Sequence, residues 1–187
     1  MSADCSASAS AVVTLSIGAR PFVKYTKPLM VAYAARIGAS FYCIESKDHE
    51  ALQLPGTSRS GGSSSATRFL KLPLLSYFLR KYSRVLYLDD DVIVGPATPD
   101  LFASVPCDAV GATIEHHKPP AWHAMHWRSA CELYSMPGRA CEPKHWRLWN
   151  SGVFLLSRAQ HAPMLERGWK RDASRLACRV LCDQVRH

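Results

Sequence analysis

The sequence of 187 residues lacks any apolar run near the roughly 20 residues that a membrane-spanning helix needs. It also lacks a block of five or more like charges, although its 23 Lys and Arg residues outnumber its 15 Asp and Glu residues. The resulting net charge of +8 at pH 7 is scattered along the chain. Scattered positive charge suits a small ligand that carries phosphate and is weak evidence for nucleic acid. We therefore expect no membrane segment in this chain and no nucleic-acid partner.

The seven cysteines form no CxxC pair, and an odd count without tight spacing is a poor disulfide framework. Reduced thiols are the simpler interpretation, and a bridge between Cys131 and Cys141 is the alternative in an oxidising compartment. Residues 1–10 lack the basic start of a signal peptide, and the apolar run that follows is too short for one. The compartment stays open: the cytoplasm is the default, and the Golgi or secretory lumen requires a targeting segment outside this chain.

Short apolar runs alternate with helical patterns along the chain. A β-branched run at 11–17 predicts a strand, and 39–44 predicts a second one. Between them lies a helical pattern with Thr26 as its cap, Pro28 in its first turn and Gly38 at its end. Strands are also expected at 85–88, 109–114 and 153–156, and helices within 67–82 and 159–181; 53–66 is a Gly- and Ser-rich loop. The order strand, helix, strand predicts an α/β fold with a mostly parallel central sheet, in one domain spanning 1–187.

Residues 115–148 differ in kind from the rest and predict a long irregular insertion within that domain. They contain a possible zinc-ligand group of His116, His117, His123, His126 and Cys131, whose spacing matches no established Cys/His signature. They also contain Trp122, Trp127 and Trp146. These side chains suit stacking on an acceptor sugar or packing beneath the loop.

Three carboxylates, Asp89, Asp90 and Asp91, follow the apolar run 85–88 directly. Adjacent carboxylates repel one another, and their burial is costly unless a cation compensates them. In extended backbone, Asp89 and Asp91 would lie on one side and could hold a hard divalent cation through oxygen. A solvent-exposed acidic turn is the simpler alternative. A phosphatase of the haloacid dehalogenase type is disfavoured, since its Asp pair follows the first strand and precedes Thr, whereas Val92 follows here.

The order of four segments resembles the family 8 glycosyltransferases, the glycogenin-like group. These segments are Arg68–Lys71, Leu86–Val94, Asn150–Leu156 and Asp183–Gln184, and the resemblance extends over 11–184 apart from the insertion. It implies a GT-A (Rossmann-like) three-layer sandwich. It also implies a metal-dependent enzyme that moves a sugar from a nucleotide-diphosphate sugar, most simply a UDP-sugar, to a hydroxyl acceptor on a saccharide, a protein or a small molecule.

The resemblance also implies a role for each matching residue. Asp89 and Asp91 would hold Mn²⁺ or Mg²⁺ against the donor diphosphate, and Asp90 would belong to the donor site. The further donor-site residues would be Thr14 and Ser16 at the base and ribose, Arg68 and Lys71 near the phosphates, and Asn150, Ser151 and Gly152 at the sugar. Asp183 and Gln184 would lie close to the reacting carbon and act in catalysis. Each assignment has a simpler alternative. Thr14 and Ser16 could be plain strand residues, Arg68 and Lys71 could be solvated charges, and 150–152 could be a turn.

One departure from the family pattern concerns the third metal ligand, a His in a later motif with Gly and Lys. The sequence ends at His187, just past Asp183, so we expect either a chain truncated at its C-terminus or a substitute histidine elsewhere. A nucleotide-sugar-binding domain without turnover is therefore an alternative function. A nucleotidyltransferase is a second alternative, disfavoured because 18–21 makes a poor phosphate loop.

Overall fold

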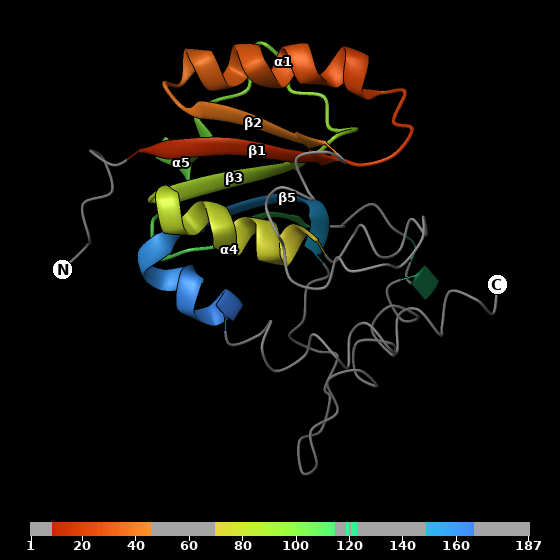
Figure 1. Ribbon diagram of the computed structural model, residues 1–187. Coiled ribbons are helices and arrows are strands. Elements are labelled where there is room, and N and C mark those ends of the chain that lie inside the picture. Colours follow the sequence, from red (N-terminus) through yellow and green to blue (C-terminus); the bar gives the residue numbers. More distant parts are fainter. Residues whose placement is uncertain (1–8, 46–69, 115–118, 120, 123–148, 167–187) are drawn as a thin grey trace. The chain divides into compact units, whose positions relative to one another are not determined.

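A computed structural model describes residues 9–45, 70–114, 119, 121–122 and 149–166 (Figure 1). The chain divides into two compact units, the first comprising Met1–Gly111 and Gly152–His187 and the second Ala112–Ser151. The second unit overlaps the predicted insertion at 115–148, most of which lies outside the described residues. The single-domain organisation stays a prediction.

The centre of the fold is a five-stranded sheet in the order β2-β1-β3-β5-β4. Its strands are β1 (Ser10–Ser16), β2 (Ser40–Glu45), β3 (Arg84–Asp89), β4 (Gly111–Ile114) and β5 (Trp149–Ser157). Strand β1 pairs in parallel with both β2 and β3, whereas β5 runs antiparallel to β3. The carboxyl ends of β1 and β3 therefore meet at one sheet edge, where α/β folds usually bind their ligands.

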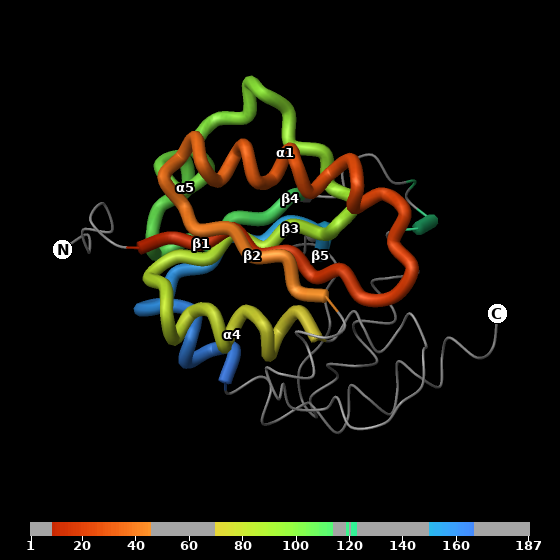
Figure 2. Tube along the Cα trace, turned by 45° about the horizontal axis from the view of Figure 1, so that its top comes forward, coloured from red at the N-terminus to blue at the C-terminus, as the bar shows by residue number. Residues whose placement is uncertain are grey.

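Helices cover both faces of the sheet in the first unit (Figures 1 and 2). Helix α1 (Val23–Arg36) packs on one face through a core that includes Met30, Val12 and Leu86. Helix α4 (Lys71–Lys81) packs on the other through a core that includes Leu75 and Tyr87. The alternation of side chains along each strand divides the buried residues between these two layers. The predicted α/β sandwich with a mostly parallel sheet is confirmed.

Helix α1 begins three residues before the predicted cap, so the prediction that Thr26 caps it is wrong. Its N-cap is Phe22, which makes no side-chain capping bond, and Pro28 lies inside the helix. Thr26 instead donates from Oγ1 to the carbonyl oxygens of Phe22 and Asp90. The predicted end is confirmed: Gly38, with φ +67, follows the C-cap Ile37.

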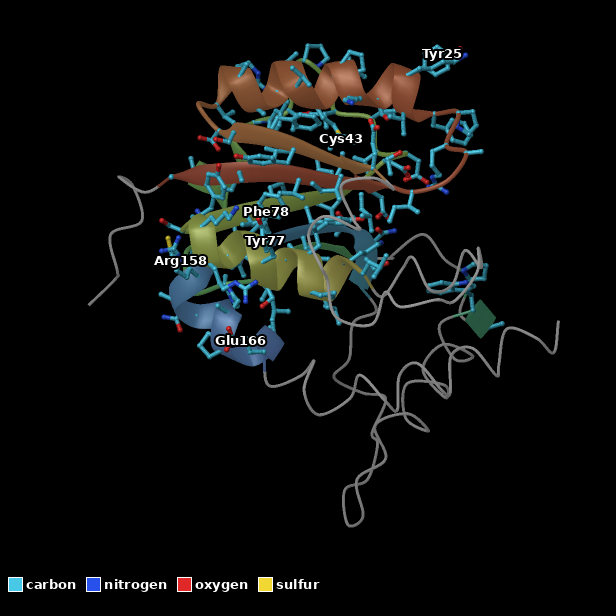
Figure 3. The ribbon with its side chains drawn as sticks, viewed as in Figure 1. Tyr25, Cys43, Tyr77, Phe78, Arg158 and Glu166 are labelled. Atoms are coloured by element: carbon cyan, nitrogen blue, oxygen red, sulfur yellow. The ribbon has the colours of Figure 1, made fainter. Side chains whose placement is uncertain are left out.

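A helical segment at 158–166 lies on the same face as α4 (Figure 1). Arg158 connects the two, because its Nε donates to the carbonyl oxygens of Leu79 and Tyr82 near the C-terminus of α4. Figure 3 shows Arg158 where the two helices meet. The rest of the helix predicted over 159–181 lies outside the described residues.

The sequence pattern did not predict the one-turn helix α5 (Leu101–Ser104). The Asp100 carboxylate caps it by accepting from the backbone N–H groups of Phe102 and Ala103. The buried Arg84 guanidinium donates to the carbonyl oxygens of Phe102 and Val105, which fixes α5 against the start of β3. Loss of surrounding water lowers the pKa of this guanidinium.

The two cysteines that the structure describes differ, and one of them contradicts the reduced-thiol interpretation. Cys107 is disulfide-bonded, whereas Cys43 on β2 is a reduced thiol. Within the described part of the chain, no helix is both long and apolar enough to cross a membrane.

Candidate functional site

The three aspartates form a tight turn at the carboxyl end of β3. The strand ends at Asp89, and the N–H of Val92 donates to the Asp89 carbonyl oxygen at 3.0 Å. The backbone is therefore not extended through Asp91, and the predicted same-side arrangement of Asp89 and Asp91 does not follow from strand geometry. The turn instead sends the three carboxylates into three different environments.

Asp90 is the buried member of the three, with 3% of its surface exposed. Its carboxylate accepts from Nε of Arg20 at 2.7 Å and from Nη2 at 2.5 Å. This bidentate pair raises the pKa of the Arg20 guanidinium, chiefly through the hydrogen bond to Asp90. Both Asp90 oxygens are thus engaged on the α1 side of the sheet.

Asp89 lies on the opposite face of the sheet, the one that α4 covers. The Lys71 ammonium is 2.7 Å from Oδ1 and 2.9 Å from Oδ2 of Asp89, and the Tyr87 hydroxyl donates to Oδ1 at 2.8 Å. Burial and then the charge of Asp89 raise the Tyr87 pKa far above its usual 10, so the phenol stays protonated. The ammonium also lies 5.3 Å from the centre of the Tyr87 ring. Lys71, only 8% exposed, therefore compensates the charge of Asp89, whose side chain is 29% exposed.

Asp91 is the exposed carboxylate of the turn. The three aspartates carry three formal negative charges, and Arg20 and Lys71 carry two positive ones, so the five side chains sum to one negative charge. A divalent cation would reverse the sign of this cluster and suit it to a diphosphate.

The two predicted residues of β1 lie deeper than the prediction required. Thr14 pairs in register with Leu88 and is 1% exposed, so it has almost no surface to offer a base or ribose. Its Oγ1 hydrogen-bonds to no group in the described ranges. Ser16, at the end of β1, is 8% exposed and lies one residue beyond Leu15, which pairs with Asp89. Any donor contact at this strand end falls to Ser16 and the residues that follow it.

Asn150, Ser151 and Gly152 lie within β5 rather than in a turn before it. The register pairs Val153 with Leu88, so one further step along the antiparallel ladder brings the buried Gly152 alongside Asp89. Ser151 is exposed and Asn150 half-buried, and both belong to the second unit.

Several predicted residues lie outside the described residues. These are Arg68, Asp183, Gln184, the histidines and Cys131 of the possible zinc group, Trp127 and Trp146. Trp122 is described and half-buried, and its backbone N–H donates to the Pro119 carbonyl oxygen.

Sequence reasoning missed Arg20 and Tyr87. A single arginine in a loop belongs to no sequence motif, and Tyr87 was interpreted only as a residue of the predicted strand. One signal was available for Arg20: parallel strands end at the same sheet edge, so the loop after β1 had to approach the acidic run after β3.

The turn offers the chemistry that a divalent cation needs. Asp89 and Asp91 supply hard oxygen ligands, and the Lys71 ammonium already occupies a cation position against both oxygens of Asp89. Among the described ranges no group of three His, Cys, Asp or Glu side chains could hold a metal. A metal at Asp89 and Asp91 would have two protein ligands from the described residues, and its remaining positions would be filled by water and donor phosphates.

The sequence model of glycosyl transferase family 8 matches residues 21–162, about three quarters of the chain. This chain belongs to glycosyl transferase family 8. It is therefore a glycosyltransferase, which uses a nucleotide-sugar donor and an acceptor, and the enzymes of this family are generally metal-dependent. The resemblance drawn from the sequence is confirmed at this level.

Among solved structures, a similar chain is a glycosyltransferase involved in the glycosylation of the major capsid of PBCV-1. The likeness covers 88% of this chain and 67% of that one, with a TM-score of 0.54 and 16% identity. At this identity it shows the fold and supports the GT-A sandwich. No curated protein matches this chain significantly.

Proposed function

We propose that this family 8 enzyme transfers a sugar from a UDP-sugar to a hydroxyl acceptor with the help of Mn²⁺ or Mg²⁺. The acidic turn at the shared end of β1 and β3 carries this proposal. It presents the exposed Asp91 beside Asp89, whose charge Lys71 compensates. An acidic surface turn without function would have little reason to bury Asp90 against Arg20 and to bond the half-buried Asp89 to Lys71 and Tyr87.

Asp89 and Asp91 would hold the metal through carboxylate oxygen. The bound metal supplies a Lewis acid for the leaving nucleoside diphosphate. Lys71 then has two anionic partners, since its ammonium can share Asp89 with the incoming phosphates. The Tyr87 hydroxyl donates to Oδ1 of Asp89 and holds this carboxylate in place.

The donor site would extend along the same sheet edge. Ser16 at the end of β1 faces the nucleoside, and Gly152 alongside Asp89 leaves room for the sugar because it has no side chain. By the family order of motifs, Arg68, Asp183 and Gln184 would belong to the donor site, and Asn150 and Ser151 stay predicted donor-binding residues. Asp90 contributes through its pair with Arg20 rather than by touching the donor.

Calorimetry of UDP binding tests the donor site, with GDP as the comparison nucleotide. We expect UDP to bind only with Mn²⁺ or Mg²⁺ present, and Asp91→Asn to weaken binding by about tenfold or more, since a lost charged ligand costs at least about 1.4 kcal/mol. Asp108→Asn is the matched control, because it removes another exposed carboxylate, one that lies outside the turn.

Two results would contradict the proposal. One is UDP binding of equal strength without any divalent cation. The other is an equal loss of affinity in Asp91→Asn and Asp108→Asn, which would reduce the turn to general surface charge.

A further inference from the structure

We propose that Arg20 is a positioning residue of the donor site, which removes Asp90 from metal binding and leaves Asp89 and Asp91 as the ligand pair. This inference rests on the proposed metal-dependent function. It concerns how one residue of the β1–α1 loop selects two of three adjacent carboxylates.

The contact joins two segments that lie 70 residues apart in the sequence. Arg20 donates through Nε and Nη2 to the two different oxygens of Asp90, the parallel arrangement in which guanidinium and carboxylate fit best. The Asp90 side chain is 4% exposed and that of Arg20 is 43% exposed. A carboxylate so enclosed needs a charged partner, and Arg20 is the partner that the structure gives it.

Asp90 has a second anchor on the same side. Thr26, itself 3% exposed, donates from Oγ1 to the Asp90 carbonyl oxygen at 2.5 Å. The β1–α1 loop thus holds the side chain of the middle aspartate through Arg20, and the first turn of α1 holds its main chain through Thr26. The turn between Asp89 and Val92 is fixed in space by these two contacts together.

The anchor matters because three consecutive carboxylates offer a cation three possible pairs. Asp89 points to the α4 face, where Lys71 and Tyr87 hold it, and Asp90 points to the α1 face. The Asp90 side chain is 4% exposed, whereas that of Asp89, although bonded to Lys71 and Tyr87, is 29% exposed. With Asp90 enclosed and held by Arg20, the pairs that include it are unavailable. Without Arg20, a buried and uncompensated Asp90 would seek water or the cation itself, and the turn would lose its orientation.

The experiment compares Arg20→Met, Arg20→Lys, Asp90→Asn and the double variant Arg20→Met/Asp90→Asn with the unmodified protein. Lys27→Met is the matched control: it also breaks an ion pair of α1, with Glu45, but both partners are about 40% exposed. Three readouts are taken for each protein. They are the Mn²⁺ affinity and Mn²⁺ paramagnetic resonance spectrum without nucleotide, the affinity for UDP with Mn²⁺, and the melting temperature.

We expect Arg20→Met to alter the Mn²⁺ spectrum and to weaken Mn²⁺-dependent UDP binding by about tenfold or more, while Lys27→Met changes neither. Arg20→Lys should lose most of the same affinity, because it keeps the charge but not the two parallel bonds. The double variant should bind no more weakly than Arg20→Met, since both changes break one contact and Asp90→Asn removes the charge that Arg20→Met leaves uncompensated.

Failure of the inference is distinct from failure of the proposed function. If the unmodified protein binds no UDP with Mn²⁺, the proposed function fails. If it binds UDP and Arg20→Met binds equally with an unchanged Mn²⁺ spectrum, the positioning role is overturned. Losses that add in the double variant would overturn it too, because Arg20 would then act on the donor directly. A fall in melting temperature with unchanged spectrum and affinity would reduce the pair to a purely structural one.

Discussion

Lys71 shows most clearly how one side chain can serve both the fold and the site. It begins α4, is almost fully buried, and places its ammonium against both oxygens of Asp89 and near the Tyr87 ring. The same carboxylate is the proposed metal ligand. Lys71 and the metal therefore compete for Asp89 in the absence of nucleotide, and cooperate once a diphosphate brings more negative charge.

We predict opposite effects of Lys71→Met on two ligands. Mn²⁺ should bind severalfold more tightly without nucleotide, because the competing ammonium is gone. UDP with Mn²⁺ should bind about tenfold more weakly, because a charged contact to the phosphates is lost. Titration calorimetry measures both affinities, and Lys81→Met, an exposed lysine at the other end of α4, is the control. Weaker Mn²⁺ binding in Lys71→Met would show that the two cations do not compete.

At the scale of elements, the sequence predicted the helices and strands whose apolar residues recur with a regular spacing. The five strands and the α4 amphipathic face follow from apolar spacing, since burial on a sheet or helix face demands it. The start of α1 was misplaced because Thr26 has the chemistry of a cap. Its hydroxyl instead donates to the carbonyl oxygen of Asp90, which lies 64 residues away in the sequence. The turn at Asp89–Val92 was predicted as extended backbone for the same reason, because a contact distant in sequence decides the local structure. Bonds to Arg20 and Lys71 determine where the carboxylates of Asp90 and Asp89 point.

The junction of β5 with segment 158–166 contains a histidine that neutral pH keeps uncharged. His161 is 5% exposed, and its Nδ1 accepts from the Ser157 N–H at 2.8 Å. Burial lowers its pKa below the usual 6.5. The unfolded chain therefore takes up a proton at higher pH than the folded chain does, so this histidine costs stability as pH falls below about 6.5.

We predict that His161→Asn, which keeps an acceptor for the Ser157 N–H but cannot gain charge, flattens the acid limb of the stability curve. Melting temperatures between about pH 7.5 and 5.5 should fall less steeply in this variant than in the unmodified protein. His161→Ala should lower stability at all pH values, by about 1–3 kcal/mol, because it leaves a buried N–H without an acceptor. Parallel pH curves for the unmodified protein and His161→Asn would contradict the assignment.

Aromatic and apolar side chains of α1 face solvent, as Tyr25 does in Figure 3. Phe22 and Tyr25 are 61% and 65% exposed and flank the helix start that holds Asp90. The element thus combines a buried side that positions the acidic turn with an open apolar side near its first turn. Tyr77 and Phe78 on α4, in contrast, pack edge to face against each other.

At the scale of the molecule, family membership and geometry support each other at different levels. The family match gives glycosyl transfer, and the sheet topology brings the ends of β1 and β3 together. The net charge of +8 suits an anionic donor. Residues carried by family order alone, such as Asp183 and Gln184, could be predicted from sequence but lie outside the described residues, and their roles stay predictions.

Turnover of donor sugars tests the central claim most directly. A panel of UDP-sugars is incubated with the protein, with and without Mn²⁺, and UDP release is followed with and without simple saccharide acceptors. We predict UDP release from at least one donor that requires Mn²⁺ and falls by about a hundredfold or more in Asp89→Asn and Asp91→Asn, while Asp108→Asn stays active. Release that is equally fast without any divalent cation, or that survives both substitutions in the turn, would contradict metal-dependent transfer at Asp89 and Asp91.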